Sequence, residues 1–335
     1  MVLLEGGMKK IFVVKQGGIG DVIIATPIFA ELKKLYPDSY LTLMVFPNAV
    51  DLVAGLPFID EVYPYDKKRN SMFELWRKML GNDMAIFLDL SYRPAMAAAL
   101  AGVPIRVGLE HKRKIWLTYK VKWQEYMDHI YEPYVFGDIL KHIGIDIPRE
   151  RLDRLYVAPA GQEDASRLHE VLQENGLAAG EGYVVSSPIT AYFLKNWPLE
   201  RWNELYKRIY DMYGLKCVVF GTGELDFAWD EQAVVNLWGR LSLRQVRELI
   251  ANASLLVNSC SMPVHVAAAT GTPCVVLYGF GDHNRWAPRH KCELVVTSLP
   301  CSPCDGYYGS KCTEPKCMQQ MTVDEVFAAV KRVLK

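Results

Sequence analysis

The sequence predicts an α/β protein built from two successive doubly wound parallel sheets. Short runs of β-branched and other apolar residues alternate with longer segments of helical periodicity, which is the pattern of parallel βαβ units. At 335 residues the chain is longer than one hydrophobic core usually organises. A polar, helix-like stretch followed by a Gly/Ala-rich break, residues 159–182, separates the two series. We therefore expect two domains facing an interdomain cleft, where such folds bind ligands.

The expected strands follow the buried apolar runs in chain order. The first domain, residues 1–158, has predicted strands at 10–14, 41–46, 85–89 and 106–108, and its clearest helix at 21–35. After a linker region at 159–182, the second domain, residues 183–335, has predicted strands at 183–187, 216–220, 255–258, 274–278 and 293–297.

Composition excludes several classes of partner. Lys plus Arg and Asp plus Glu both number 38, so no global field draws the chain to nucleic acid or to an anionic membrane. The longest apolar runs have the length of strands, far below the roughly 20 residues of a membrane-spanning helix. The first ten residues do not form a secretory signal pattern. We expect a cytoplasmic protein, with contact at the inner face of the membrane as an alternative.

A glycine loop with an acidic residue follows the first strand. The segment Lys15-Gln16-Gly17-Gly18-Ile19-Gly20-Asp21 lacks the GxGxxG spacing, and an Asp at the start of a helix would repel a phosphate. The carboxylate of Asp21 is therefore the more attractive functional group. The helix N-terminus favours its ionised form and the glycines allow a substrate to approach closely, which suits a general base. The structural alternative is that Asp21 only caps the helix.

Two segments of the second domain suit a phosphate-bearing ligand. Lys195 lies shortly before a predicted helix and could neutralise a diphosphate leaving group, although a solvated lysine is the alternative. The turn at 258–265 joins a buried strand to a helix, and its free amides can bind an anion. His265 could donate to a phosphate or hydroxyl, or be a structural histidine.

Together these segments resemble glycosyltransferase family 9, the ADP-heptose heptosyltransferases of lipopolysaccharide assembly. The resemblance covers nearly the whole chain. It rests on four ordered matches: residues 17–21 with Thr26-Pro27, residues 101–108, residues 195–198, and residues 261–273 with His265.

The resemblance implies a GT-B fold of two Rossmann-like domains, with the acceptor on the first and the nucleotide sugar on the second. It implies inverting transfer of a sugar, with heptose from ADP-heptose as the expected donor group, to a lipopolysaccharide-core or related glycan or glycolipid, without a catalytic cofactor or metal. Asp21 matches the catalytic base. The remaining assignments are an acceptor-side loop of Gly17, Gly18 and Gly20, and a donor-binding set of Ser187, Lys195, Cys260, Ser261, Met262 and His265.

The chain departs from the family pattern at the donor turn. The family usually has Asn-Asp-Ser/Thr-Gly where this chain has Ser259-Cys260-Ser261-Met262. A thiol is a poor acceptor compared with a carboxylate, so the sugar contact should be weakened or made differently. The departures leave open a different sugar or a non-catalytic nucleotide-sugar-binding relative. A GT-B nucleotide-sugar epimerase is a further alternative, against which Asp21 argues.

Four cysteines cluster near the C-terminus. Cys301, Cys304, Cys312 and Cys317 could hold a structural zinc ion or an iron–sulfur cluster, although their spacing fits no standard ribbon. Disulfides and free thiols are the alternatives.

A basic and aromatic stretch lies in the first domain. Residues 111–123 interleave His, Lys and Arg with Ile and Trp. Such a stretch could contact an anionic glycolipid core or a membrane surface as a peripheral interaction. The alternative is a solvated charged loop.

Overall fold

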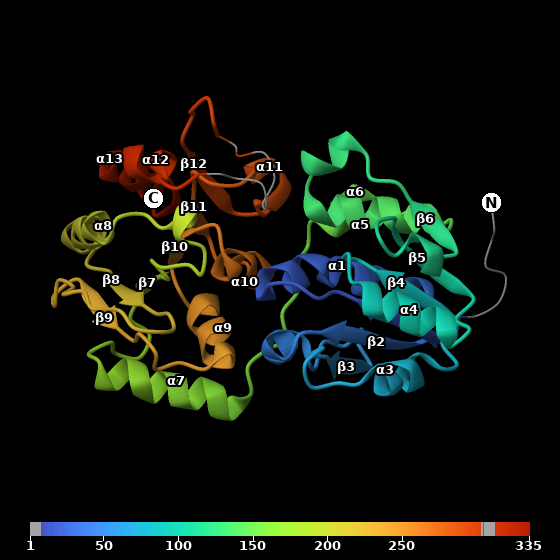
Figure 1. Cartoon of the computed structure of the whole chain (residues 1–335). Helices are drawn as coiled ribbons and strands as arrows, with labels where there is room; N and C mark the ends of the chain where they lie inside the picture. The colour runs from blue at the N-terminus through green and yellow to red at the C-terminus, as the bar shows by residue number, and fades with distance from the viewer. Residues whose placement is uncertain (1–7, 303, 305–311) are drawn as a thin grey trace. The chain divides into compact units, whose positions relative to one another are not determined.

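The computed structural model describes residues 8–302, 304 and 312–335, and it divides into two compact units, Met1–Ala158 and Pro159–Lys335. Each unit contains one six-stranded sheet in which all neighbouring strands run parallel. Helices cover both faces of each sheet (Figure 1). The predicted α/β class with two doubly wound parallel sheets is therefore confirmed.

The first unit has the strand order β3-β2-β1-β4-β5-β6. Its strands are β1 (Lys10–Val14), β2 (Tyr40–Val45), β3 (Glu61–Pro64), β4 (Met84–Phe87), β5 (Ile105–Leu109) and β6 (Tyr119–Val121). Its α-helices are α1 (Ile19–Leu35), α2 (Val50–Val53), α3 (Met72–Met79), α4 (Tyr92–Leu100), α5 (Glu132–Lys141) and α6 (Arg149–Leu152), with short 3-10 helices at Pro47–Ala49, Lys114–Trp116 and Glu125–Asp128.

The second unit repeats the same winding, with the strand order β12-β11-β10-β7-β8-β9. Its strands are β7 (Tyr183–Ser186), β8 (Lys216–Val219), β9 (Val234–Asn236), β10 (Leu255–Ser259), β11 (Cys274–Tyr278) and β12 (Cys292–Val296). Its α-helices are α7 (Gln162–Glu174), α8 (Leu199–Tyr213), α9 (Leu243–Ala251), α10 (Met262–Thr270), α11 (His283–Trp286), α12 (Lys316–Gln320) and α13 (Val323–Val333), with the 3-10 helix η4 at Phe193–Lys195.

Buried apolar side chains fill the space between each sheet and its helices. In the first unit, the core includes Phe12 and Phe87 from the sheet with Leu75 of α3 and Ala97 of α4. In the second unit, sheet residues pack against α8 and α13, and α7 packs on α9. Residues 159–182 thus include a helix that belongs to the second unit.

Each sheet reverses its winding direction at one place. The chain moves outward from β1 to β2 and β3, and then returns to add β4 on the other side of β1. The second sheet reverses in the same way between β7 and β10. In such sheets, ligands bind outside the carboxyl ends of the strands at this reversal. The fold therefore predicts that the functional residues lie in the segments that follow β1, β4, β7 and β10.

No helix in the described parts of the chain is both long enough and apolar enough to cross a membrane.

Candidate active site

Asp21 lies in the first turn of α1, directly after the loop that follows β1. Gly18 caps the helix, and the Oδ2 atom of Asp21 accepts a hydrogen bond from the Gly18 N–H at 2.7 Å. The capping role that the sequence offered as an alternative is therefore present. It occupies only one oxygen, because Oδ1 accepts no hydrogen bond from the described residues. The side chain is partly exposed, and its role as a base stays a prediction.

The glycines of the loop make room for this carboxylate. A Cβ atom at Gly17 would lie 2.8 Å from Oδ2 of Asp21, and one at Gly18 would lie 3.2 Å from the same atom. Since neither glycine has a positive φ, steric room and not a left-handed backbone explains both. Gly20 lies within the first turn of α1. The loop thus wraps closely around the Asp21 carboxylate.

Asp89, which follows β4, holds the start of this loop. Its Oδ2 accepts the Gln16 N–H at 2.5 Å, and its Oδ1 accepts the Ser91 N–H at 2.6 Å. The Gln16 side chain in turn donates from Nε2 to the Tyr65 carbonyl at 3.2 Å. These bonds join the segments after β1, β3 and β4 at the carboxyl edge of the sheet, beside the reversal point. The start of the loop that leads to Asp21 is therefore held by hydrogen bonds to the segments after β3 and β4.

Arg113 supports the same edge from the segment after β5. The side chain is fully buried, with Nη1 3.9 Å from Oδ1 of Asp89 and Nε donating to the Leu109 carbonyl at 3.1 Å. Burial lowers the pKa of Arg113 to about 10, while the Asp89 carboxylate opposes that shift. The guanidinium stays charged at neutral pH. Gly108 gives it space, because a Cβ there would lie 3.0 Å from Nη2.

The structure divides the basic stretch at 111–123, which the sequence presented as one exposed surface. Arg113 is buried, and Trp116 packs against the core. Ile115 and Trp123 are exposed, at 67% and 40%. The reading of the whole stretch as a solvated or membrane-facing loop is therefore wrong for Arg113, since that side chain makes its hydrogen bonds inside the unit.

In the second unit, Asn258 joins the strands on either side of the reversal point. Its Oδ1 accepts the Ser187 N–H at 2.6 Å, just after β7. Its Nδ2 donates to the Ser259 carbonyl at 2.8 Å and to Ser261 Oγ at 2.9 Å, at the end of β10. Ser187 and the predicted donor turn are thus brought together, 71 positions apart in the sequence.

The donor turn leads directly into α10. Ser261 is the N-cap residue and Met262 the first helical residue, and both are partly exposed. His265 is 4% exposed and lies inside the second half of the first turn. Cys260 is buried, at 5% exposure. Donor contacts at these positions stay predictions, and at Cys260 we expect the backbone rather than the thiol to make one.

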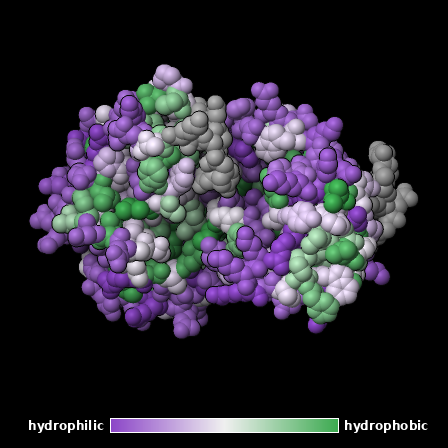
Figure 2. Space-filling model, viewed as in Figure 1, coloured by the Kyte–Doolittle hydropathy of each residue, from purple (hydrophilic) through white to green (hydrophobic). Residues whose placement is uncertain are grey.

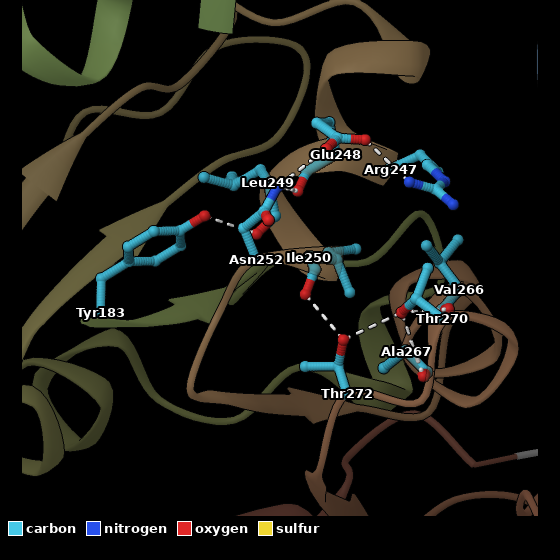
Figure 3. Close-up of polar contacts among 10 residues, drawn as sticks. All are labelled: Tyr183, Arg247, Glu248, Leu249, Ile250, Asn252, Val266, Ala267, Thr270 and Thr272. Atoms are coloured by element: carbon cyan, nitrogen blue, oxygen red, sulfur yellow. Dashed lines mark hydrogen bonds and ion pairs between the residues drawn. The ribbon is translucent and has the colours of Figure 1, made fainter. Parts of the chain in front are cut away.

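The far end of α10 is anchored by a polar network (Figure 3). Thr272 Oγ1 donates to the Ile250 carbonyl of α9 at 2.8 Å and lies 2.9 Å from Thr270 Oγ1. The Tyr183 hydroxyl at the start of β7 donates to the Leu249 carbonyl, also at 2.8 Å. The network ties α9 and α10 to the sheet, which fixes the direction in which the N-terminus of α10 points.

Lys195 ends η4, in the segment that connects β7 to α8. Asn196 accepts hydrogen bonds at Oδ1 from the Thr190 N–H at 2.8 Å and from Thr190 Oγ1 at 3.0 Å. The Tyr192 ring packs on Phe280, which follows β11, with centroids 4.9 Å apart. Lys195 is partly exposed. Lys195 therefore lies on a segment that these contacts hold in place, at the same carboxyl edge of the sheet as Ser187 and the donor turn.

The clustered cysteines do not form a metal centre in the described residues. No three His, Cys, Asp or Glu side chains within residues 8–302, 304 and 312–335 are arranged to hold a metal ion. All eight cysteines are thiols, so the disulfide alternative is not observed. Cys317 is buried in α12, where burial raises the pKa of its thiol, and Cys301 is exposed. Residues 303 and 305–311 of the Cys-rich segment lie outside the described residues.

No individual role was predicted for Asp89, Arg113 or Asn258, although the stretch at 111–123 and the turn at 258–265 include the last two. Asp89 and Asn258 were each the last residue of a predicted strand, and a polar residue ending a buried strand at a reversal point is the signal that could have identified them. No local signal marks Arg113, because its partners come from other segments.

Comparison with known proteins gives consistent matches. The family model described as glycosyltransferase family 9 (heptosyltransferase) matches residues 72–312. Lipopolysaccharide heptosyltransferase 3 of Escherichia coli is 23% identical over 297 residues, which are 80% of this chain and 83% of that protein.

Two solved structures share the fold of the whole chain. A glycosyltransferase of family 9 from Veillonella parvula has a TM-score of 0.80 at 19% identity and covers 97% of both chains. The ADP-heptose lipopolysaccharide heptosyltransferase II of E. coli has a TM-score of 0.73 at 21% identity, covering 97% of this chain and 98% of that one. At these identities the likeness concerns the fold alone.

Proposed function

Because the chain belongs to glycosyltransferase family 9 and has a GT-B fold, we propose that it transfers a heptose from ADP-heptose to a lipopolysaccharide-core or related glycan acceptor. The single observation that supports this most is the partly exposed Asp21 carboxylate, held in a glycine loop at the reversal point of the first sheet. In this proposal the first unit binds the acceptor and the second binds the donor.

Asp21 acts as the general base of an inverting displacement. Oδ1 takes the proton of the acceptor hydroxyl as that oxygen forms a bond to the anomeric carbon, through an oxocarbenium-like transition state. The bond from the anomeric carbon to the diphosphate oxygen breaks, and its electron pair leaves with the diphosphate. The attack and the departure occur on opposite sides of that carbon, so its configuration inverts.

Lys195 and the N-terminus of α10 stabilise the leaving diphosphate. The amides at the start of α10 and the Lys195 ammonium group lie at the carboxyl edge of the second sheet, and both favour an anion there. With these groups supplied by the protein, the proposal assigns no catalytic role to a metal or cofactor.

The buried Cys260 favours one alternative function. Its thiol is buried and is a poorer acceptor than the carboxylate that the family resemblance implies for sugar binding. A nucleotide-sugar binder without transfer activity would fit this feature. Family membership and the Asp21 loop favour transfer over this alternative.

A donor screen followed by a transfer assay tests the proposal. We expect calorimetry to show selective binding of ADP and ADP-heptose over UDP, GDP and CDP, and mass spectrometry to show a heptose added to a heptose-deficient lipopolysaccharide core. Binding of ADP-heptose without transfer to any such acceptor would favour the non-catalytic alternative. Preference for another nucleotide sugar would replace the proposed donor.

Replacing Lys195 by Ala is expected to lower kcat by about 10- to 100-fold, because the partly exposed ammonium group then no longer stabilises the leaving diphosphate. Steady-state kinetics with saturating acceptor measure the effect, and Lys195→Arg should recover most of it. Lys216→Ala is the matched control, since Lys216 is the first residue of β8 and lies at the amino ends of the parallel strands, away from the carboxyl ends where Lys195 lies. Equal kinetics for Lys195→Ala and the wild type would remove Lys195 from the site.

A further inference from the structure

Helix α3 of the first unit exposes large apolar side chains. Phe73 is 62% exposed and Leu80, which directly follows the helix, is 43% exposed, while Trp76 is partly exposed. The rings of Phe73 and Trp76 are in contact, with centroids 5.5 Å apart. Residues spaced three, four and seven apart share one side of a helix. The three side chains therefore lie on one side of the helix, and we call this surface the α3 face.

The fold of the unit does not require the α3 face. The core contacts of this helix are made by Leu75 and Met79, which are fully buried against the side of the sheet that α4 also covers. The helix has its own N-terminal signal, since Ser71 and Glu74 form a capping box with bonds of 3.1 and 2.9 Å. An exposed aromatic cluster that the core does not need is typical of an interaction surface.

The charges around the α3 face are mostly positive. Residues 66–80 contain five basic side chains and two acidic ones. Lys67, Lys68 and Arg69 are exposed in the loop before α3, and Arg77 is exposed on the helix itself. Figure 2 shows apolar residues gathered over α3 and α4, at the lower right of the view, with hydrophilic residues around them. An aromatic surface bordered by Lys and Arg is complementary to an anionic lipid bilayer.

The segment that leads into α3 begins beside the candidate acceptor loop. The Tyr65 carbonyl, which begins the connection to α3, accepts the Gln16 Nε2 hydrogen bond at 3.2 Å. The Lys67 carbonyl accepts a hydrogen bond from Arg93 Nη1 at 2.9 Å, and Arg93 lies in α4 near the carboxyl end of β4. The basic loop and the Asp21 loop therefore share one edge of the first sheet.

We infer that the α3 face docks this protein on the surface of an anionic lipid bilayer. Phe73, Trp76 and Leu80 enter the headgroup boundary, and the neighbouring basic side chains meet anionic headgroups. Docking in this way holds the Asp21 edge of the first unit near lipid-linked glycans. This last step rests on the proposed acceptor, whereas docking itself does not.

The stretch at 111–123 is the competing surface in the same unit. It exposes Ile115, but Arg113 is buried and Trp116 packs inward. The Trp123 indole donates a hydrogen bond to Asp128 at 3.0 Å, which places a carboxylate beside the second exposed ring. Trp116 of this stretch contacts the Tyr92 ring, with centroids 6.3 Å apart, but its other side packs on the core. The Phe73 and Trp76 rings are closer, at 5.5 Å, and Phe73 is 62% exposed, so we favour the α3 face.

Vesicle co-sedimentation of the full chain tests the inference. We expect binding to vesicles of phosphatidylcholine with 30% phosphatidylglycerol, with weaker binding in 0.5 M salt and little binding to phosphatidylcholine alone. Phe73→Ser should lower the partition coefficient by about fivefold, because one partly inserted aromatic side chain is lost. Ile115→Ser is the matched control from the competing surface, and Met212→Ser, at 55% exposure, is the control from the second unit.

Three results would each overturn the inference. The first is that the wild type does not bind the anionic vesicles. The second is that Ile115→Ser loses binding while Phe73→Ser does not. The third is that Phe73→Ser changes the oligomeric state in solution, which would make the α3 face a contact between copies of the chain. Transfer to a water-soluble truncated acceptor should be equal in Phe73→Ser and the wild type. Failure of docking with intact transfer would contradict this inference alone, while docking without any transfer would contradict the proposed function alone.

Discussion

Replacing Asp21 by Asn is expected to lower kcat by about 10²- to 10⁴-fold, with stability and donor affinity close to those of the wild type. The amide retains an oxygen that can accept the Gly18 N–H, which bonds to Oδ2 at 2.7 Å, so the start of α1 should keep its geometry. What the variant loses is the group that accepts the proton of the acceptor hydroxyl. Steady-state transfer kinetics, calorimetry with ADP and thermal unfolding measure the three quantities.

The capping role of Asp21 can be separated from its role as base. Asp21→Ala removes both the base and the bond to Gly18, so it should add a loss of stability of about 1 kcal/mol that Asp21→Asn does not show. If Asp21→Ala alone lost stability while kcat of both variants stayed at the wild-type value, Asp21 would be a helix cap only. Turnover unaffected by Asp21→Asn would by itself exclude Asp21 as the base.

Gly17→Ala displaces the carboxylate without removing it. The added Cβ would lie 2.8 Å from Oδ2, so the Asp21 side chain must shift, and kcat should fall although every candidate catalytic group is retained. Gly161→Ala is a matched control. Gly161 is the N-cap of α7 and, like Gly17, precedes an acidic residue of the first helical turn, but an added Cβ there would lie 3.8 Å from Asp164 Oδ2, an ordinary contact.

All the central strands could be predicted from the sequence, whereas of the four edge strands only β12 was predicted, at 293–297. The strands at 10–14 and 274–278 were predicted with the bounds observed for β1 and β11, because continuous β-branched runs are typical of strands buried on both faces. The three strands that were missed, β3, β6 and β9, are short and each lies at an edge of its sheet. Since an edge strand is half exposed, its composition resembles that of a loop.

The candidate site was predicted only where its chemistry is local in sequence. The loop before Asp21 and the turn at 258–265 are strand-to-helix connections, which spacing reveals. The bond from Gln16 to Asp89 joins residues 73 positions apart, so no local pattern could indicate it. Arg113 resembled a solvated base because its neighbours in sequence are charged, while the space that buries it is made by Gly108 and Asp89.

Replacing Asn258 by Leu is expected to destabilise the second unit strongly. The side chain is fully buried and makes three hydrogen bonds, to the Ser187 N–H, the Ser259 carbonyl and the Ser261 hydroxyl. Asn258→Leu would remove all three and leave backbone groups of Ser187 and Ser259 without these partners in a buried environment. We expect the free energy of unfolding of this unit to fall by about 2–4 kcal/mol. Hydrogen exchange of peptides covering β7 and β10 resolves this loss from the behaviour of the first unit.

The same substitution should also weaken ADP binding, because Asn258 orients the N-cap of α10 against the end of β7. Asn252→Leu is the matched control: Asn252 also donates two hydrogen bonds, to the carbonyl and carboxylate of Glu248 (Figure 3), but it is exposed, so we expect a change of only about 0.5 kcal/mol. Asn258→Asp keeps the acceptor for the Ser187 N–H and loses both donated hydrogen bonds. Its loss of unfolding free energy should lie between those of Asn252→Leu and Asn258→Leu. ADP affinity that is equal in Asn258→Leu and Asn252→Leu would show that the turn before α10 does not bind the donor, even if the loss of stability were as large as expected.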